Sequence, residues 1–342
     1  MIDLLIAGAG PAGLFTALFA RDAGLTVQVV EPRRPPIDKA CGEGLMPGAV
    51  RILGQVGLQL GRDLSGQPFG GIRYLDGGRT AESRFRSGTG WGVRRDELQV
   101  ALYRAAVGRG VQMVTGTVDS VEQDATSVTA GGITARYLVA ADGLHSPIRR
   151  RLGLQLPNDR PPRWGLRRHI RIAPWADVVE VYWSRSAEAY LTPIGPEEVS
   201  VALLTGARAS FQDQLTAFPE LAARLSSLAG DDVRGAGPLR QRVRSRVAGR
   251  VLLVGDAAGY VDALTGEGID IAARSARELV RCLVADRPAD YERAWSLVTR
   301  RYRYLTSALL AARRRERVRR QLVGAAARYP KAFDLAVGQL TR

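Results

Sequence analysis

The chain has 342 residues, 46% hydrophobic and 24% charged, which is typical of a soluble globular protein with two domains or one large one. It has no apolar run of the ~18 residues that a membrane span needs, no signal-peptide pattern at its start and no disulfide framework, so we expect a cytoplasmic protein. The net charge is +15, but all except two of the 49 basic residues are arginines, most of them scattered, and we do not expect nucleic-acid binding.

The first 31 residues predict a dinucleotide-binding unit. An apolar run over residues 2–7 predicts a buried strand, and the turn Gly8-Ala9-Gly10-Pro11-Ala12-Gly13, a helix and a second strand that ends at Glu31 follow it. Gly8 permits the tight turn, Gly10 lets a pyrophosphate approach the backbone, and Gly13 lets helix pack on strand. The helix N-terminus favours the phosphates, and Glu31 is placed to accept a hydrogen bond from a ribose hydroxyl. The alternative is a glycine-rich turn in an ordinary α/β unit.

A long connection rich in proline and glycine follows, over residues 32–46. It contains Lys39-Ala40-Cys41-Gly42-Glu43-Gly44, and a loop of this length inside a compact domain is usually functional. We expect Gly42 and Gly44 to let the backbone lie against a flat cofactor ring, although a surface loop with glycine turns would look the same. Helices are predicted over residues 47–57 and 95–107, a hairpin over 69–85 and short strands over 111–141.

The pattern changes after residue 165 to strands of alternating character. Parallel α/β structure followed by an antiparallel block predicts a second, sheet-based domain inserted in the first. Further along, we expect a helix over residues 211–228, a buried strand over 250–254 that leads into Gly255-Asp256, a helix over 268–285, and an almost uninterrupted helix over 291–328.

Three motifs together resemble the signatures of FAD-dependent oxidoreductases of the p-hydroxybenzoate hydroxylase type. They are Gly8–Gly13 with Glu31, Asp142-Gly143 with Ser146 and Arg149, and Gly255-Asp256. The sequences Lys39-x-Cys41-Gly42-x-Gly44 and Leu264-Thr265-Gly266-Glu267-Gly268-Ile269 are more similar to the geranylgeranyl-reductase-like branch. The resemblance covers residues 1 to about 285 and implies an α/β fold. In that fold residues 1–70, 90–160 and 240–290 form a Rossmann-like FAD-binding domain, 71–89 and 161–239 an antiparallel substrate domain, and 291–342 a helical C-terminal region.

The resemblance also implies roles for single residues. Asp256 would accept hydrogen bonds from the ribityl chain, or would only cap a turn. The helix that begins near Gly266 would direct its N-terminus at the pyrimidine edge of the flavin. Asp142 and Arg149 would contact FAD and the path of NAD(P)H, or would form an ion pair between strand and helix. The predicted cofactor-binding residues are Gly8, Gly10, Pro11, Ala12, Gly13, Glu31, Cys41, Gly42, Gly44, Arg95, Asp142, Gly143, Gly255, Asp256, Gly266, Gly268 and Ile269.

Cys41 and His169 are the candidate catalytic residues. Cys41 would lie over the flavin ring, and His169 lies on the predicted substrate-facing sheet, where it would contact substrate or serve the structure. His145 and His169 are the only histidines, and neither has a metal-ligand partner at useful spacing, so no metal is expected.

We therefore expect a single-FAD oxidoreductase with NAD(P)H as electron donor and a lipophilic or aromatic small molecule as substrate. The favoured activity is a monooxygenase that hydroxylates or epoxidises its substrate through a flavin C4a-hydroperoxide. The alternatives are a flavin-dependent reductase that saturates carbon–carbon double bonds and a non-catalytic FAD-binding redox or partner module. Residues 188–193 lack the Trp and Phe of the geranylgeranyl-reductase element, which weakens a polyprenyl substrate, and the halogenase Trp-x-Trp-x-Ile-Pro element is absent.

The C-terminal segment predicts a basic amphipathic helix. Arginines at 313–315, 317, 319 and 320 cluster around Glu316 with aliphatic residues interleaved, and such a helix could lie on an anionic membrane surface. We prefer packing of the apolar stripe on the rest of the protein, because the stripe lacks the Trp or Phe anchors of interfacial helices.

Overall fold

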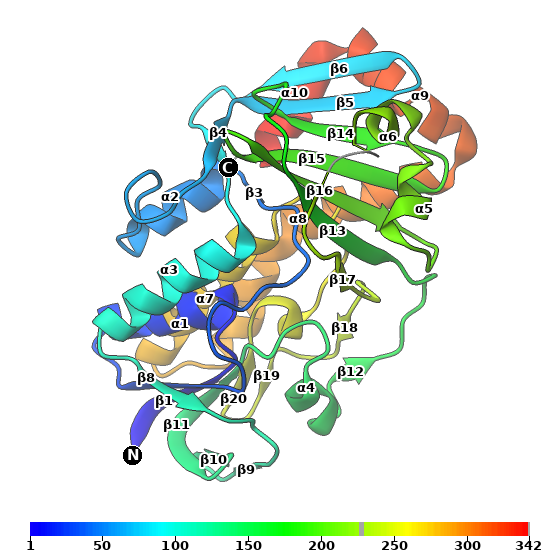
Figure 1. Cartoon of the computed structure of the whole chain (residues 1–342). Coiled ribbons are helices and arrows are strands. Elements are labelled where there is room, and N and C mark those ends of the chain that lie inside the picture. The colour runs from blue at the N-terminus through cyan, green and yellow to red at the C-terminus, as the bar shows by residue number, and fades with distance from the viewer. Residues whose placement is uncertain (226–228, 341–342) are drawn as a thin grey trace.

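The computed structural model describes residues 1–225 and 229–340, and a mixed sheet forms the lower half of the molecule in Figure 1. Its parallel strands run in the order β20 (Val251–Leu253), β11 (Ile133–Ala140), β1 (Ile2–Ala7), β2 (Val27–Glu31) and β8 (Gln112–Thr115). β19 (Val247–Ala248) pairs antiparallel with β20, and β10 (Val128–Ala130) pairs antiparallel with β11 and with β9 (Val121–Gln123). The central strands are apolar because a parallel sheet is covered on both faces.

Helices from distant parts of the chain pack together on this sheet. α1 (Pro11–Asp22) packs against α3 (Arg95–Gly108) and α7 (Gly268–Val284), and α7 also contacts α2 (Pro47–Gln55) and α8 (Asp290–Arg314). The short elements α4 (Pro147–Arg151) and η1 (Gly255–Ala258) follow β11 and β20, so both lie at the carboxyl edge of the parallel strands.

The second sheet forms the upper half of the molecule (Figure 1). Its order is β17 (Arg234–Ala236), β13 (Trp164–Ile170), β16 (Glu198–Thr205), β15 (Ala187–Gly195), β14 (Val179–Trp183), β5 (Gly71–Asp76) and β6 (Arg79–Arg84), and only the β14–β5 pair is parallel. Side chains alternate between its faces. Leu191, Val201 and Leu203 pack in one core with α5 (Phe211–Leu215) and α6 (Pro219–Leu225), whereas Tyr190 and Leu204 belong to another cluster on the opposite side.

Two small sheets complete the fold. β3 (Gly44–Leu45), β7 (Gly90–Gly92) and β4 (Gln67–Phe69) form one, and β12 (Gln155–Leu156) and β18 (Arg242–Val243) form the other. β7 lies directly against β15, since a Cβ on Gly92 would be 1.6 Å from the carbonyl oxygen of Pro193. This close approach joins the three-stranded sheet to the second sheet.

The predicted α/β fold, with its Rossmann-like sheet, antiparallel sheet and helical C-terminus, is confirmed, but two predicted helices are wrong in extent. The helix expected over residues 211–228 is divided into α5 and α6, because Pro219 supplies no N–H and disfavours helix at the residue before it; residues 226–228 lie outside the described part. The helix expected over 291–328 breaks at Arg315, whose ψ of 106° is extended. The break lets α8 pack on α7 while α9 (Glu316–Arg328) packs on β6.

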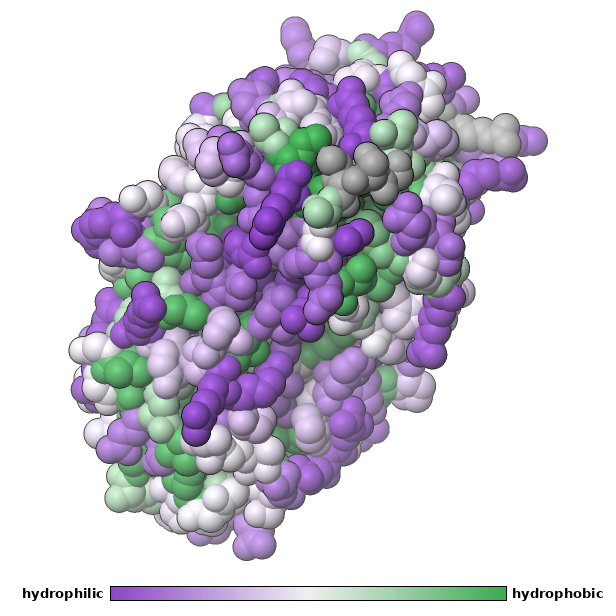
Figure 2. Space-filling view, in the orientation of Figure 1, coloured by the Kyte–Doolittle hydropathy of each residue, from purple (hydrophilic) through white to green (hydrophobic). Residues whose placement is uncertain are grey.

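The C-terminal helices cover the second sheet with their apolar side chains. Leu310 of α8, Val323 of α9 and Phe333 of α10 (Pro330–Leu340) are buried in the same cluster as Tyr74 of β5. The face in view in Figure 2 is mainly hydrophilic, with apolar side chains in small separate groups. Among the described helices, none has both the length and the apolar character needed to cross a bilayer.

Candidate cofactor and substrate site

A cavity of about 940 Å³ is lined by both halves of the molecule, a size typical of cofactor and small-molecule sites. It is charged where the glycine turn and η1 line it and apolar where the second sheet lines it. Gly8, Gly13, Glu31 and His169 do not line it. The predicted residues that do are Gly10, Pro11, Ala12, Cys41, Gly42, Gly44, Arg95, Asp142, Gly143, Gly255, Asp256, Gly266, Gly268 and Ile269.

The glycine turn after β1 brings bare backbone to this cavity. Gly8 has a φ of +109°, and a Cβ there would lie 2.5 Å from the carbonyl oxygen of Ala141. A Cβ on Gly13 would lie 2.0 Å from the carbonyl oxygen of Gly8. A Cβ on Gly10, in contrast, would approach nothing closer than Arg95 Nη2 at 3.9 Å. Gly8 and Gly13 therefore serve packing, while Gly10 leaves the uncapped N-terminus of α1 open to the cavity.

Glu31 supports the turn from the end of β2. Its Oε2 accepts a hydrogen bond from the Ala9 N–H at 3.0 Å, and its Oε1 accepts one from Arg33 Nε at 2.9 Å. The carboxylate is buried beside the turn, outside the lining of the cavity. Its contact with a ribose stays a prediction.

Charged side chains without sufficient partners gather at the polar end of the cavity. Nη1 of Arg95 and Oδ1 of Asp142 are buried and have no hydrogen-bond partner among the described residues. Burial lowers the pKa of Arg95 and of Lys39 and raises the pKa of Asp142 and of Asp256, whose carboxylate is open to the cavity. Buried polar groups are normally hydrogen-bonded, so these groups indicate a ligand that carries both anionic and hydroxyl groups.

Arg149 fixes the two loops that carry Asp142 and Asp256. Its guanidinium is fully buried and donates to the carbonyl oxygens of Leu144 at 2.7 Å and Ala257 at 3.0 Å. Asp142 instead accepts from the Ile148 N–H at 3.1 Å. In the described structure Arg149 does not line the cavity and forms no ion pair with Asp142: it donates to these backbone carbonyls and to the side-chain oxygens of Gln155 and Gln241. Its contact with FAD and with the path of NAD(P)H stays a prediction.

The N-terminus of α7 also points its backbone at the cavity. Gly266 has a φ of +68°, and Gly266, Gly268 and Ile269 line the cavity. The helix has no side-chain cap, and the side chain of its N-cap residue, Glu267, forms an ion pair with Arg301 at 3.2 Å. Burial raises the pKa of Glu267 to about 7. No local pattern marks this carboxyl group, since it becomes buried, 2% exposed, only in the tertiary structure.

Cys41 lies in the cavity as a thiol. Burial, and then the neighbouring Glu43, raise the pKa of its Sγ, which accepts a hydrogen bond from the Glu43 N–H at 3.4 Å. A Cβ on Gly42 would meet nothing within 4 Å. The segment of residues 41–42 therefore contributes a neutral thiol to the cavity and leaves free space beside it for a ligand.

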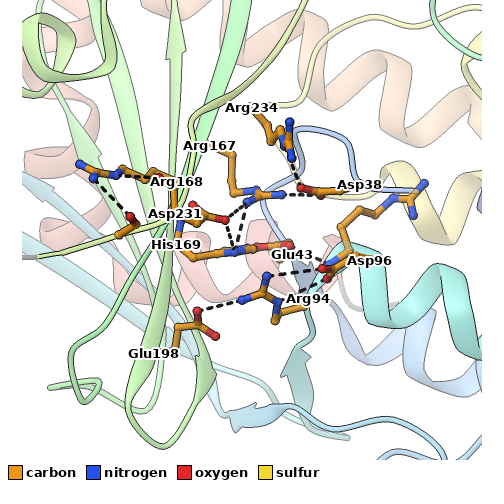
Figure 3. A network of polar contacts seen from close by, with 12 residues as sticks. Asp38, Glu43, Arg94, Asp96, Arg167, Arg168, His169, Glu198, Asp231 and Arg234 are labelled. Atoms are coloured by element: carbon orange, nitrogen blue, oxygen red, sulfur yellow. Dashed lines mark hydrogen bonds and ion pairs between the residues drawn. The ribbon is translucent and has the colours of Figure 1, made fainter. Parts of the chain in front are cut away.

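His169 is placed differently from the expectation that it contacts substrate. Its ring is 1% exposed, Nε2 lies 2.7 Å from Glu43 Oε2, and Nδ1 lies 2.8 Å from Asp231 Oδ2 (Figure 3). Glu43 has a φ of +60°, a strained value for a residue with a side chain, and its Oε1 accepts from the Arg95 N–H at 2.7 Å. Because both ring nitrogens are engaged, His169 holds Glu43, and thus the Cys41 segment, in position.

Arg167 extends the same network to the start of the connection. It is fully buried on β13, pairs with Asp231 at 2.9 Å and also pairs with Asp38, which Arg234 contacts at 3.1 Å (Figure 3). These residues are far apart in the sequence, and no local pattern could have associated them. The network ties the cofactor-side connection to the second sheet.

Apolar side chains of the second sheet form the opposite wall. Tyr190 is anchored by its hydroxyl, which donates to the carbonyl oxygen of Leu264 at 2.8 Å. The wall contains Ile72, Tyr74, Val179, Val181, Ala202 and Leu204 of the sheet, and Leu239 and Leu264 from outside it.

The model of the FAD binding domain family matches residues 1–287. The chain belongs to this family of FAD-dependent enzymes of the p-hydroxybenzoate hydroxylase type. This oxidoreductase is 29% identical to a menaquinone reductase of Mycolicibacterium smegmatis over 325 residues, 86% of this chain and 79% of the relative. It is 30% identical to digeranylgeranylglycerophospholipid reductase 1 of Methanopyrus kandleri over 302 residues, 79% and 77% of the two chains. Its fold matches a flavoprotein/dehydrogenase from Cytophaga hutchinsonii with a TM-score of 0.81 at 18% identity, covering 98% and 96% of the chains.

The residues of the cavity fit FAD. The bare N-terminus of α1 and the unpartnered guanidinium of Arg95 suit a pyrophosphate, and the open carboxylate of Asp256 suits the ribityl hydroxyls. The N-terminus of α7 suits the electron-rich edge of a flavin. Bound FAD supplies hydride chemistry to this FAD-dependent oxidoreductase, and the protein supplies binding, orientation and exclusion of water. Within residues 1–225 and 229–340, no cluster of three or more candidate metal ligands occurs.

Proposed function

We propose that this oxidoreductase is a reductase that saturates a carbon–carbon double bond in an apolar, polyprenyl-like substrate. The observation that carries this proposal is the neutral thiol of Cys41, which lines the same cavity as the charged residues of the cofactor end and the apolar wall. Reduction of a double bond adds a hydride to one carbon and a proton to the other. Reduced FAD, regenerated by NAD(P)H, would supply the hydride, and the Cys41 thiol would donate the proton and regain one from solvent.

Two further observations support a reductase over the monooxygenase that the sequence favoured. The apolar wall of the cavity is mainly aliphatic, with Tyr74 and Tyr190 beside the aliphatic side chains, which suits an isoprenoid chain. Several of the relatives that cover most of the chain are reductases named for menaquinone or geranylgeranyl compounds, including a chloroplastic geranylgeranyl diphosphate reductase of rice.

Monooxygenation is the second candidate. The chain is 28% identical over 313 residues to the 12-dehydrotetracycline 5-monooxygenase/anhydrotetracycline 6-monooxygenase of Streptomyces rimosus, and this match covers 81% of the chain and 61% of the relative. An apolar wall also suits the protection of a reactive oxygen species from water. The two activities differ in their need for oxygen.

The test is turnover of a menaquinone and of geranylgeranyl diphosphate under nitrogen and under air, with NADH or NADPH. We expect a product heavier by two hydrogens under nitrogen. Cys41→Ala should lower the rate by about 100-fold or more, since general acid catalysis contributes that much. Cys282→Ala is the matched control, because Cys282 is buried on α7 and does not line the cavity. Substrate-dependent oxygen uptake with a product heavier by one oxygen would instead establish the monooxygenase.

A further inference from the structure

A second cavity of about 240 Å³ adjoins the first one at η1 and the N-terminus of α7. Gly255, Asp256, Tyr260 and Gly268 line both cavities. The remaining walls of the second cavity come from α7, from α8 and from the segment of residues 240–246. Four arginines line it, namely Arg240, Arg242, Arg246 and Arg303.

The carboxylates near these arginines do not balance them. Asp159 lies 3.1 Å from Arg240 and 3.5 Å from Arg242, so that one carboxylate faces two guanidinium groups. Glu292 pairs with Arg246 at 2.8 Å. Asp256 also lines the cavity, but its charge interacts with Lys39 and Arg95 on the cofactor side. The second cavity is therefore left with an excess of positive charge.

Arg303 is an exposed arginine on α8 whose charge is opposed only in part by Glu292, which already pairs with Arg246. It forms no ion pair with the described residues, and both it and Arg246 lie over the indole of Trp295, at 5.3 and 3.8 Å from the ring centroid. Burial, and then the like charge of Arg246, lower the pKa of Arg303. Two cations are thus held on one aromatic ring with one carboxylate between them, an arrangement that an anion would stabilise.

Ser275 adds a hydroxyl group that has no hydrogen-bond partner among the described residues. It is 1% exposed and lines this cavity. It lies on the face of α7 that also carries Gly268, Ile271 and Ala272, which line the same cavity. A buried hydroxyl without a hydrogen-bond partner is destabilising. The packing of this face of α7 does not require a hydroxyl group, since the residue one turn earlier, at 272, is alanine.

We propose that the second cavity binds a phosphoryl group, held by Arg303 and Ser275 with Arg246 beside them. Guanidinium and hydroxyl donors suit the oxygens of a tetrahedral oxyanion, and the volume accommodates a phosphate but not a whole dinucleotide. The group comes either from free phosphate or from a phosphate ester such as the 2′-phosphate of NADPH. This site adjoins the cavity that suits FAD and substrate, but Arg303, Ser275 and Arg246 line only the second cavity.

The test is calorimetric titration of the FAD-loaded protein with inorganic phosphate at pH 7 in low-salt buffer. We expect one saturable site. Arg303→Gln should raise the dissociation constant for phosphate at least tenfold, and Arg303→Lys should raise it less. Ser275→Ala should raise it several-fold. Arg300→Gln is the matched control, because Arg300 is exposed on the same helix outside the cavity, and it should change the constant less than twofold.

Competition then identifies the source of the phosphate. Displacement of phosphate by NADPH but not by NADH would assign the site to the 2′-phosphate, and displacement by neither would assign it to free phosphate. Absence of saturable binding, or equal weakening by Arg303→Gln and Arg300→Gln, would overturn the proposal. The visible spectrum of bound FAD and the melting temperature verify that each variant is folded.

Discussion

Replacing Glu267 by glutamine should remove a carboxyl group whose ionisation opposes folding at neutral pH. The side chain is 2% exposed, its Oε2 has no hydrogen-bond partner among the described residues, and Arg301 at 3.2 Å compensates only part of the loss of solvation. Burial therefore raises the pKa of Glu267 from 4.5 to about 7. At about 1.4 kcal/mol for each pH unit, this difference corresponds to about 3 kcal/mol.

The sign follows from which state holds the proton. Below pH 4.5 the carboxyl group is protonated in the folded and the unfolded chain, and the group does not oppose folding. Between pH 4.5 and about 7 the unfolded chain releases the proton while the folded protein retains it, so the free energy of unfolding falls as the pH rises. Above pH 7 the full penalty is present. Glu267→Gln should match the wild type near pH 4.5 and exceed its stability by about 3 kcal/mol at pH 8.

Urea unfolding of the protein with saturating FAD, followed at pH 5, 6, 7 and 8, measures this difference. Glu197→Gln serves as the control, because Glu197 is exposed in the turn between β15 and β16, and its effect should stay within about 0.5 kcal/mol at every pH. A difference between wild type and Glu267→Gln that does not change with pH would refute the reasoning. So would a wild type that is the more stable protein at pH 8.

Three further changes test the cofactor side. Glu31→Ala should weaken FAD binding by about 1.5–3 kcal/mol, because the predicted charge-assisted hydrogen bond to the adenosine ribose would be lost. Unchanged retention of FAD on dialysis would contradict this. Gly13→Ala should yield protein without FAD, because the new Cβ would lie 2.0 Å from the carbonyl oxygen of Gly8. Gly54→Ala is the control and should retain FAD, because a Cβ there has no other atom within 4 Å. The visible absorbance of the purified variants measures the bound FAD. Arg149→Ala should lower the free energy of unfolding by roughly 3 kcal/mol or more, because buried carbonyl groups lose their donor; a melting temperature within a degree of wild type would exclude this role.

The sequence by itself determined the nucleotide-binding unit and the fold class. The glycine spacing from Gly8 to Gly13, the apolar strand before it and the acid at residue 31 are local features of the sequence, and such features have the same physical requirements in every chain. For the same reason, the predicted set of cofactor residues falls largely on one cavity, because the carboxyl edges of neighbouring parallel strands converge there.

Tertiary structure alone decided which side chains meet. Glu43 and His169 are 126 residues apart, and only the docking of the connection on β13 makes them partners and turns a candidate catalytic histidine into a support. The break at Arg315 arises because α8 and α9 pack on different elements, a choice that helical periodicity does not encode. Burial acts in the same way on Glu267: its distance from solvent depends on α8, whose Arg301 lies 34 residues further along the chain. Pairing, burial and charge balance are properties of contacts between distant segments, and these come into existence only when the chain is folded.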